Sequence, residues 1–291
     1  MKILVTGSNG QLGRELQALS PEFPSFSFIF TDVNELNITD GPAVLSFIQT
    51  NHPDVIINCA AYTNVDKAEI EFSNAKKINA SAVANLVTGA IDIYALFIQI
   101  STDFIFGGER TIPYLEDDTP RPLSIYAKTK YEGELETYSR SFNSVIIRTS
   151  WLYSEYGHNF VKTIIDKGGA LGNLKVVYDQ IGSPTYARDL ARTILTIIPK
   201  IGHLDRVQTF HYSNEGLASW YDFAQSIVEY SGIKCKIQPV RTSEYPLPAK
   251  RPTYSVMDKS KIKKTFGLEI PDWRKSLKEC IQKINDNLSV V

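Results

Sequence analysis

The chain has 291 residues, a net charge of −1, 43% hydrophobic residues and 22% charged residues. This composition is typical of a soluble globular protein, and the length suits one large α/β domain or a cofactor domain with a smaller lobe. The near-neutral charge offers no basic face for nucleic acid, and no apolar run reaches the ~18 residues that cross a bilayer.

Three cysteines and four histidines are scattered along the chain without a Cys-x-x-Cys spacing. Isolated cysteines in odd number argue against a disulfide framework or a zinc site and indicate a reducing compartment. Residues 2–5 already have the pattern of a strand, so we expect no signal peptide before them. We therefore expect a cytoplasmic protein without a bound metal and without a membrane or nucleic-acid partner.

A glycine-rich turn follows the first predicted strand. Residues 1–6 are apolar and lead into Gly-Ser-Asn-Gly-Gln-Leu-Gly, after which leucines share one stripe of a helix. Glycines let the backbone bend tightly and approach a pyrophosphate, and N–H groups at a helix start can bind that pyrophosphate. Strand, turn and helix in this order indicate a dinucleotide site rather than a turn without a ligand. The predicted cofactor contacts here are Gly7, Gly10, Gln11, Leu12 and Gly13.

The second predicted strand, residues 26–31, ends at Asp32. A carboxylate about 20 residues past the glycines accepts hydrogen bonds from the adenosine ribose. Its charge repels a 2′-phosphate, which favours NADH, whereas Arg14 could pair with that phosphate in NADPH. Both NADH and NADPH therefore stay open as cofactors. Asn37 and Ile38 follow at a distance that can reach the adenine.

The third predicted strand covers residues 53–60 and ends in small residues. Ligands bind at the carboxyl edge of an open parallel sheet, and small residues there let a cofactor lie close to the backbone. We therefore add Ala60, Ala61, Tyr62 and Thr63 to the predicted cofactor contacts.

One long helix is expected to start at Val65 and to continue through Asn79 and Leu86. Asn79 lies in otherwise apolar sequence, and a buried amide needs hydrogen-bond partners. We expect its side chain to brace the active-site loop.

The fourth predicted strand, residues 96–100, delivers Thr102 to the same edge of the sheet. Tyr126 and Lys130 follow on the next helix, and a spacing of four places both on one helix face. Free tyrosine titrates near pH ~10, and a nearby positive charge favours the phenolate and lowers that value. A Tyr-x-x-x-Lys pattern also arises by chance, but the preceding strand, the threonine and the glycine turn favour an acid–base site. The predicted catalytic residues are Tyr126, Lys130 and Thr102.

A fifth predicted strand at residues 144–148 completes an alternation of strands and helices. This alternation predicts an α/β fold with a doubly wound parallel sheet and right-handed crossovers. We expect residues 1–150 to form the cofactor domain, with part of 170–215 returning to it, and 151–291 to form mainly a smaller, discontinuous substrate lobe that interleaves with it. The expected elements after Trp151 are helices at 159–168, 187–198, 220–231 and 273–288 and strands within 176–185 and at 209–212.

Several motifs occur together in a fixed order. They are GSNGQLG at 7–13, NCAAYT at 58–63 followed by VDKAE at 65–69, STDFIF at 101–106, YAKTK at 126–130, RTSW at 148–151, DQIGSPT at 179–185 and RP at 251–252. As a set they resemble the dTDP-4-dehydrorhamnose reductase branch of the extended short-chain dehydrogenase/reductase family. The resemblance covers the chain to about residue 255, and it implies a Rossmann fold.

The resemblance implies that NADH or NADPH delivers hydride to the C4 ketone of dTDP-4-dehydro-L-rhamnose. The product would be dTDP-L-rhamnose, a precursor of cell-surface polysaccharide. Tyr126 would protonate the alkoxide, Lys130 would lower the tyrosine pKa and bind the nicotinamide ribose, and Thr102 would bind the C4 oxygen. Asp103 and Trp151 would contact the sugar, although core packing is an equal interpretation of Trp151.

The resemblance also places Asn159, Arg251 and the loop around Gln180 near the dTDP phosphates or base. Arg251 is the best of these, because a guanidinium fork suits a phosphate. A dTDP-sugar is therefore the expected substrate, and the family allows a homodimer. Phe104 stands where this family usually has Tyr, and Gly107 where it often has Asp, so the two positions change fine substrate contacts and leave the catalytic set intact.

Two other functions stay open. One is another sugar-nucleotide enzyme of the same fold, but a dehydratase commonly has Glu at the position of Phe104. An epimerase needs only the shared Tyr and Lys, and would show no net consumption of NADH. The other is a non-catalytic NADP-binding regulatory subunit resembling that of methionine adenosyltransferase, against which the presence of Thr102, Tyr126 and Lys130 argues.

Overall fold

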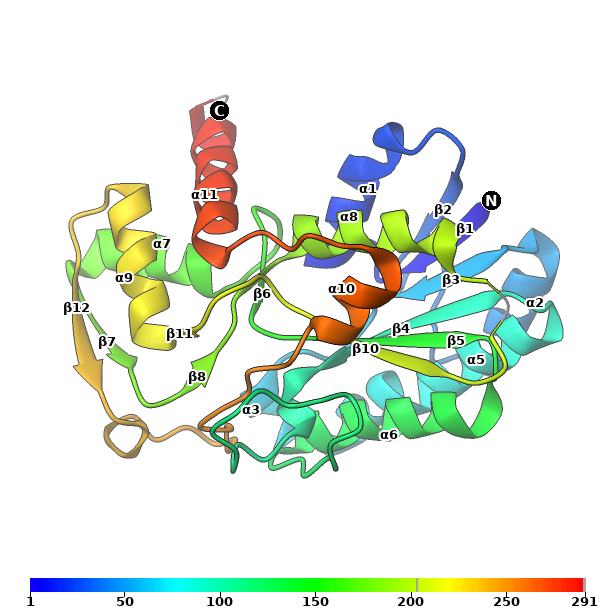
Figure 1. The fold of residues 1–291 in the computed structure, drawn as a ribbon, viewed down its shortest axis with the longest axis horizontal. Coiled ribbons are helices and arrows are strands. Elements are labelled where there is room, and N and C mark those ends of the chain that lie inside the picture. The colour runs from blue at the N-terminus through cyan, green and yellow to red at the C-terminus, as the bar shows by residue number, and fades with distance from the viewer. Residues whose placement is uncertain (203, 290–291) are drawn as a thin grey trace.

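The computed structural model describes residues 1–202 and 204–289. Its main body is a six-stranded sheet in which every strand pair is parallel (Figure 1). Among the described helices, none is long and apolar enough to cross a membrane. The strand order is β10-β5-β4-β3-β1-β2, with β1 at Lys2–Thr6, β2 at Ser27–Thr31, β3 at Val55–Asn58, β4 at Leu96–Thr102, β5 at Ser144–Thr149 and β10 at Gln208–Tyr212.

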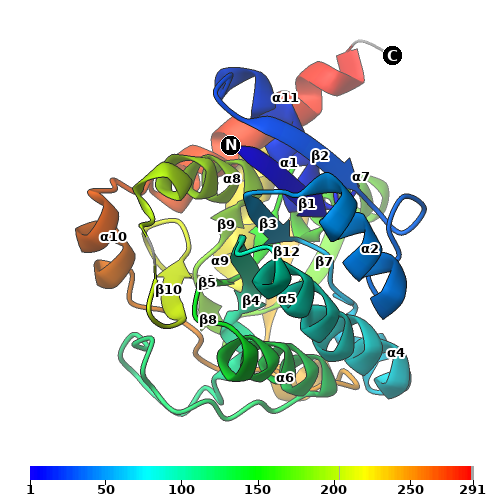
Figure 2. The same cartoon turned by 90° about the vertical axis from the view of Figure 1, so that its right-hand side faces the viewer.

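Helices cover both faces of this sheet. The central strands are near-continuous apolar runs, as expected for parallel strands that are buried on both sides. Figure 2 shows α1 and α8 on one side of the strands and α2, α5 and α6 on the other. This arrangement confirms the predicted doubly wound α/β fold. The covering helices are α1 at Gln11–Leu19, α8 at Ala187–Ile197, α10 at Ser260–Phe266, α2 at Gly41–Asn51, α5 at Ala82–Asp92 and α6 at Ile125–Arg140.

The chain reverses its direction of travel across the sheet between β1 and β3. From β1 it crosses to β2 on one side, and it then returns past β1 to β3 on the other side. At such a switch point the connections leave on opposite faces of the sheet. A crevice therefore opens at the carboxyl ends of β1 and β3, where ligands bind in open α/β sheets.

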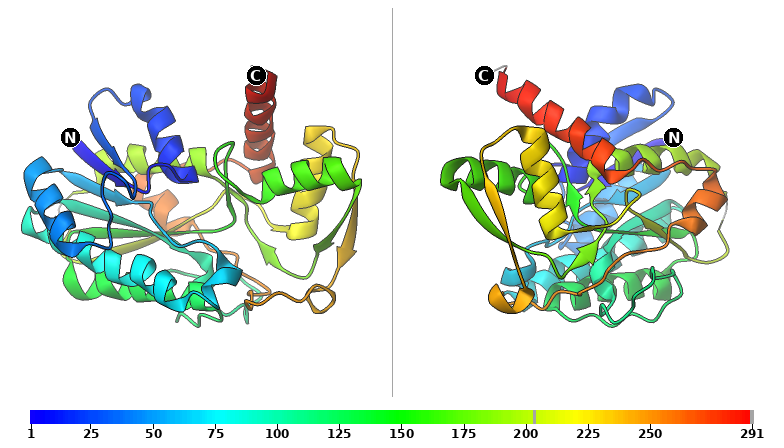
Figure 3. Two further views of the ribbon diagram at one scale, coloured as in Figure 1. Left: turned by 180° about the vertical axis from the view of Figure 1, so that it is seen from behind. Right: turned by 60° about the vertical axis from the view of Figure 1, so that its left-hand side comes forward.

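A smaller lobe has a separate apolar core and lies at one end of the sheet (Figures 1 and 3). The lobe is discontinuous along the chain, because α8 and β10 lie between its segments in the sequence. Helix α8 packs beside α1 on the sheet, and β10 is a strand of the sheet. The elements of the lobe are α7 at Phe160–Leu171, α9 at Trp220–Ser231, α11 at Trp273–Ser289 and the strand pairs β6 at Leu152–Tyr153 with β9 at Thr185–Tyr186, β7 at Asn173–Val177 with β12 at Lys236–Val240, and β8 at Ile181–Gly182 with β11 at Ala218–Ser219.

The expectation of one helix from Val65 through Leu86 is wrong. The segment divides into α3 at Val65–Ala68, α4 at Phe72–Lys76 and a π-helical turn, η2, at Lys77–Ser81, before α5 begins. The extra residue in a π turn changes the direction of the side chains that follow. Asn79 lies within this turn, and its side-chain amide hydrogen-bonds the backbone of Tyr62 in the loop after β3.

We predict that Gly133→Ala destabilises the fold by about 1–3 kcal/mol, because a Cβ on this residue of α6 would overlap the backbone carbonyl of Asn79. Gly169→Ala is the matched control, since Gly169 lies in α7 with no atom near its would-be Cβ. The control should gain about 0.5–1 kcal/mol from helix propensity. Urea unfolding of both variants measures the two changes, and equal effects would contradict the close approach of α6 and η2.

Candidate active site

A cavity of about 1380 Å³ lies between the crevice of the sheet and the smaller lobe. Segments that are distant in the sequence meet in its lining. Most of the residues proposed from the sequence as cofactor, catalytic or substrate contacts lie on this lining: Gly7, Gly10, Gln11, Leu12, Asp32, Asn37, Ile38, Ala60, Ala61, Thr63, Thr102, Asp103, Tyr126, Lys130, Trp151, Asn159 and Arg251.

The glycine turn is held against the loop after β3. Gly7 has a φ of +65°, and a Cβ there would lie 2.6 Å from the backbone nitrogen of Ala60. Only glycine therefore permits both the left-handed backbone and the close approach. Gly10 directly precedes α1, so the free N–H groups of the first turn lie at the cavity. This cradle fits the pyrophosphate of a dinucleotide.

Gly13 is off the cavity lining. A Cβ on this residue would strike the carbonyl oxygen of Gly7 and the backbone of Ser8. The absence of a side chain at Gly13 thus lets α1 pack against its own turn, which shapes the cradle without a direct contact.

Asp32 presents a fixed carboxylate at the edge of the cavity. Its Oδ2 accepts the Asn9 N–H at 2.9 Å, and its Oδ1 accepts the Val33 N–H at 2.8 Å. These bonds hold the end of β2 beside the glycine turn. A carboxylate in this place can accept hydrogen bonds from a ribose.

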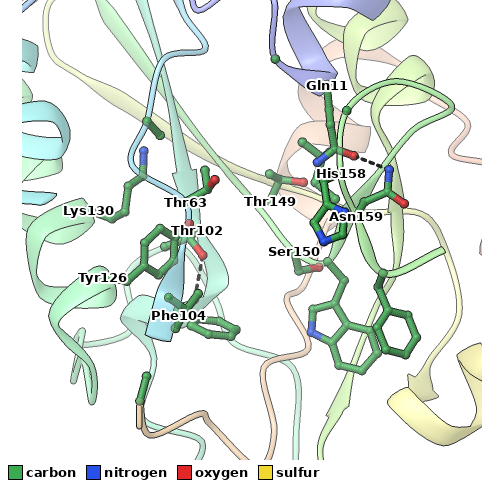
Figure 4. Close-up of a pocket in the computed structure, with 18 of the residues that line it drawn as sticks. Gln11, Thr63, Thr102, Phe104, Tyr126, Lys130, Thr149, Ser150, His158 and Asn159 are labelled. Carbon is green, nitrogen blue, oxygen red and sulfur yellow. Dashed lines mark hydrogen bonds between the residues drawn. The ribbon is translucent and has the colours of Figure 1, made fainter. Parts of the chain in front are cut away.

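The wall opposite the lobe carries Thr102, Tyr126 and Lys130 (Figure 4). Thr102 ends β4, where its hydroxyl accepts the Phe104 N–H at 3.2 Å. Helix α6 begins at Ile125 because the Ser124 side chain caps it, which places Tyr126 in the first turn and Lys130 one turn later. The Nζ of Lys130 donates to the Ile100 carbonyl at 2.6 Å, and this bond ties α6 to β4.

Burial dominates the acid–base properties of this wall. It raises the pKa of Tyr126 to about 12, against a lowering by the Thr102 hydroxyl. It also lowers the pKa of Lys130 to about 8. The expectation that Lys130 brings the tyrosine pKa below its ordinary value is therefore not met in this arrangement, because the loss of solvation outweighs the hydrogen bond with Thr102 and the charge of Asp103 raises the pKa further.

Asp103 is a buried carboxyl beside this pair. Its side chain is 2% exposed, and its Oδ1 accepts the Thr102 hydroxyl at 3.1 Å. Burial raises the pKa of Asp103 to about 7, although the hydroxyls of Ser255 and Thr102 oppose that rise. The carboxyl can therefore be neutral or charged within the ordinary range of assay conditions.

Asn79 joins the cofactor edge to the catalytic helix, as we expected from its place in an apolar stretch. Its Oδ1 accepts the Tyr62 N–H at 2.8 Å, and its Nδ2 donates to the Tyr62 carbonyl and to the Thr129 hydroxyl, both at 3.1 Å. The ring of Tyr62 is off the cavity lining, because its hydroxyl donates to Glu71 at 3.0 Å. Tyr62 therefore differs from its predicted role, and Ala60 and Ala61 form the floor beside it.

Trp151 forms part of the lobe wall. Its ring stacks on Trp220 with centroids 3.6 Å apart, and a Cβ on Gly182 would lie 2.6 Å from it. Its backbone has a φ of +46°, which is strained for a residue with a side chain. The ring is thus both packed and exposed to the cavity, so it can offer an apolar face to a ligand.

Two of the proposed substrate contacts are held by protein partners. The amide of Asn159 donates to the Gln11 side chain at 3.0 Å, which connects the lobe to the glycine turn (Figure 4). Arg251 donates to both carboxylate oxygens of Asp66, at 2.8 and 3.2 Å. Both pairs link the lobe segments to the cofactor side of the cavity.

Sequence reasoning missed several lining residues. Lys167, Lys175 and Lys250 add positive charge to the lobe side, and His158 lies beside Asn159 (Figure 4). Lysines on a helix end, a strand and a loop carry no pattern that separates them from ordinary surface residues.

Known proteins resemble the chain over nearly its whole length. A family model described as the RmlD substrate binding domain matches residues 1–286. The dTDP-4-dehydrorhamnose reductase of Aggregatibacter actinomycetemcomitans is 40% identical over 285 residues, which cover 95% of this chain and 97% of that protein.

Two solved structures have the same fold and substantial sequence identity. The crystal structure of a dTDP-4-dehydrorhamnose reductase from Clostridium acetobutylicum has a TM-score of 0.93 at 45% identity, covering 98% of this chain and 100% of that chain. The structure of the enzyme of that name from Bacillus anthracis, in complex with NADP, has a TM-score of 0.92 at 38% identity, with 97% and 99% covered.

We predict a pH-dependent stability difference between the wild type and Asp103→Asn. The Asp103 pKa is about 7 in the folded protein and about 3.9 in an unfolded chain. Between these values the folded state binds more protons, so wild-type stability falls as the pH rises, and the full penalty is present above the folded value. The variant lacks this ionisation. The difference in unfolding free energy between the variant and the wild type should therefore increase as the pH rises from about 3.9 to about 7. The increase should be about 1.4 kcal/mol for each pH unit in that range.

Urea unfolding at about pH 5 and about pH 8 measures this difference. Asp117→Asn, on the exposed surface, is the matched control. A constant difference between Asp103→Asn and the wild type across that range would show that the carboxyl titrates alike in the folded and unfolded chains.

Proposed function

The chain belongs to the dTDP-4-dehydrorhamnose reductase family, and we propose on this basis that it reduces the C4 ketone of dTDP-4-dehydro-L-rhamnose to dTDP-L-rhamnose with NADH or NADPH. The observation that carries the proposal is the meeting of Thr102, Tyr126 and Lys130 on one wall of a cavity that the glycine turn also lines. A ketone reductase needs a proton donor in the same cavity as its dinucleotide cradle.

The residues of the cradle fit a dinucleotide. Gly7 and Gly10 leave room for the pyrophosphate at the start of α1, and Asp32 can accept hydrogen bonds from the adenosine ribose. When bound, the reduced cofactor supplies the hydride. The relative from Bacillus anthracis was solved with NADP, which supports a dinucleotide in the corresponding cavity of this chain.

Tyr126 donates the proton that completes the reduction. Hydride addition leaves negative charge on the ketone oxygen, and an alkoxide is a much stronger base than a phenolate. Transfer from Tyr126 is therefore downhill even though its pKa is about 12. Lys130 stabilises the phenolate that forms, and the Thr102 hydroxyl orients the oxygen.

The smaller lobe, which comes mainly from the chain after residue 150 and is discontinuous, would bind most of the dTDP-sugar, with the sugar at Asp103 and Trp151. The lysines at 167, 175 and 250 give this side of the cavity positive charge, which suits a diphosphate, and Arg251 lies on the same lining as an ion pair with Asp66. Residues 1–150, with α8 and β10, would hold the cofactor. The two parts would act together because the Asn159–Gln11 and Arg251–Asp66 contacts connect them.

The remaining alternatives differ in their use of the cofactor. A dehydratase of this fold commonly has a carboxylic acid after Thr-Asp, but this chain has Phe104, whose ring lies edge-on to Tyr126 with centroids 5.9 Å apart. An epimerase returns its cofactor to the starting state, and a regulatory subunit leaves the ketosugar unchanged. Purified protein that oxidises one NADH or NADPH for each ketosugar reduced supports the reductase, whereas turnover without net oxidation supports the epimerase.

We predict that Tyr126→Phe lowers kcat by about 10²–10⁴, because the variant loses the proton donor and keeps the ring. Dinucleotide affinity, measured by fluorescence titration, should be close to that of the wild type. Tyr131→Phe, on the same helix but packed in another cluster, should keep its activity. Near-normal turnover by Tyr126→Phe would refute the catalytic assignment.

We predict that Asp32→Asn raises the ratio of kcat/KM with NADPH to kcat/KM with NADH. The carboxylate of Asp32 lies at the cavity edge and would repel a 2′-phosphate, so its neutralisation favours the phosphorylated cofactor. Asp92→Asn, on an exposed residue at the end of α5, is the control. An unchanged ratio in Asp32→Asn would place the 2′-hydroxyl away from this residue.

A further inference from the structure

Lys130 is an ammonium group in an unfavourable place. Its side chain is 4% exposed, and the hydrogen bond that fixes its Nζ goes to the neutral Ile100 carbonyl. Burial of an ammonium disfavours the charged form, and here it lowers the pKa of Lys130 to about 8. A neutral amine could not stabilise a phenolate on Tyr126, so the site depends on a compensating negative charge.

Glu134 lies one helical turn after Lys130 on α6 and is 0% exposed. A spacing of four places the two side chains on the same helix face. The Oε1 of Glu134 accepts the Ser101 hydroxyl at 2.5 Å, and Arg148 donates to both carboxylate oxygens, at 3.0 Å from Nε to Oε1 and at 2.8 Å from Nη2 to Oε2. The carboxylate is therefore immobile.

Strand β4 sets the relative position of the two charges. Ile100 accepts the ammonium of Lys130, and the next residue, Ser101, donates to the carboxylate of Glu134. Consecutive residues of one strand thus hold a cation and an anion from consecutive turns of one helix. Glu134 is bound by Ser101 and Arg148, so it acts on Lys130 through its electric field and not through a direct hydrogen bond. The side chain of Lys130 therefore stays on the cavity lining.

We propose that Glu134 is a positioning residue of the reductase, whose fixed negative charge keeps the buried Lys130 protonated beside Tyr126. This inference rests on the function proposed above and assigns a role to a residue outside the cavity lining. It also gives a reason for an ion pair in the core, since buried pairs are weak evidence for stability by themselves.

The other charged and titratable groups around this pair are compatible with that role. On the Lys130 side, burial raises the pKa of the Cys59 thiol to about 12, so the thiol is neutral. On the Glu134 side, Arg148 binds the Glu116 carbonyl at 2.9 Å and lies 3.3 Å from the His211 ring. Burial and the charge of Arg148 lower the pKa of His211 to about 3, so the ring is neutral.

Tyr138 is another titratable group near Glu134 and Arg148, and burial raises the pKa of its hydroxyl. It is therefore neutral wherever the lysine titrates. Two further carboxyls lie nearby: Asp103 is beside Tyr126, with a pKa that burial raises to about 7, and Glu116 is beside Arg148, with a pKa that burial also raises. Among the charges around the lysine, that of Glu134 raises the pKa of Lys130 against the effect of burial.

Competitive acetylation of the ligand-free protein tests the proposal. Trace acetic anhydride reacts only with neutral amines, so the extent of labelling of the Lys130 peptide across a pH series, measured by mass spectrometry, gives the midpoint of its ionisation. Glu134→Gln should lower that midpoint by about one pH unit. Glu134→Asp keeps the charge and should return the midpoint close to that of the wild type. Glu136→Gln, which removes a partly exposed carboxylate of the same helix that pairs with Arg140, is the control and should leave the midpoint in place.

The pH profile of kcat provides the second measurement. If Glu134 acts through the charge of Lys130, the alkaline loss of kcat in Glu134→Gln moves to lower pH together with the labelling midpoint. A purely structural role would lower the stability or the activity of the variant and would move neither midpoint. An unshifted midpoint in soluble Glu134→Gln overturns the proposal.

Glu134→Gln leaves Arg148 buried without its anion and can fail to fold. Glu134→Leu combined with Arg148→Met replaces the pair by apolar side chains, an exchange that proteins often tolerate. This double variant should also have a lowered Lys130 midpoint, and a wild-type midpoint in it overturns the proposal. A ligand-free wild type in which Lys130 is already mostly neutral at neutral pH overturns it without any variant.

These outcomes are separate from those that test the function. Labelling uses neither dinucleotide nor sugar, whereas the reductase assignment stands or fails on the oxidation of NADH or NADPH by the wild type with the ketosugar. A working reductase with unshifted midpoints removes only the role of Glu134. Shifted midpoints without ketosugar reduction support the charge coupling and remove the reductase.

Discussion

The hydrogen bond from Lys130 to the Ile100 carbonyl is the interaction on which the site depends. It fixes α6 against β4 near the point where Thr102 ends the strand and Tyr126 lies in the first turn of the helix. It also carries an ammonium into a buried environment, and this burial sets the acid–base properties of the whole wall. The same Ile100 carbonyl accepts the Gln99 amide at 2.9 Å, so the lysine is anchored to a polar row inside the sheet.

That polar row crosses three strands at the carboxyl edge. Thr6 on β1 donates to Asn58 on β3 at 2.7 Å, and Asn58 donates to Gln99 on β4 at 2.8 Å. Each buried group has a partner, as the low polarity of the interior requires. The row aligns the glycine turn, the loop of small residues and the catalytic strand. The cradle and the proton donor are therefore placed by one set of contacts, with Asn79 holding the loop to α6.

The smaller lobe completes the cavity but has its own core. Its aromatic residues, among them Trp151 and Trp220, pack together away from the sheet. Polar contacts join this lobe to the cofactor side at Gln11 and Asp66, at Glu15, which accepts the Ser154 hydroxyl, and at Asp189, which accepts the Ser276 hydroxyl. The lobe and the sheet therefore have separate cores and meet at the cavity.

The sequence by itself determined the local parts of this protein. The apolar runs, the glycine turn and the four-residue spacing of Tyr126 and Lys130 predicted the doubly wound sheet, the cradle and the facing side chains, because the period of an element decides which residues share a face. The tertiary structure alone decided the rest. The break in the helix after Ala68, the outward ring of Tyr62 and the pairing of Arg251 with Asp66 all depend on partners that are distant along the chain. The raised pKa of Tyr126 and the coupling of Lys130 to Glu134 depend on burial, and burial follows from how the crossovers bring the layers together.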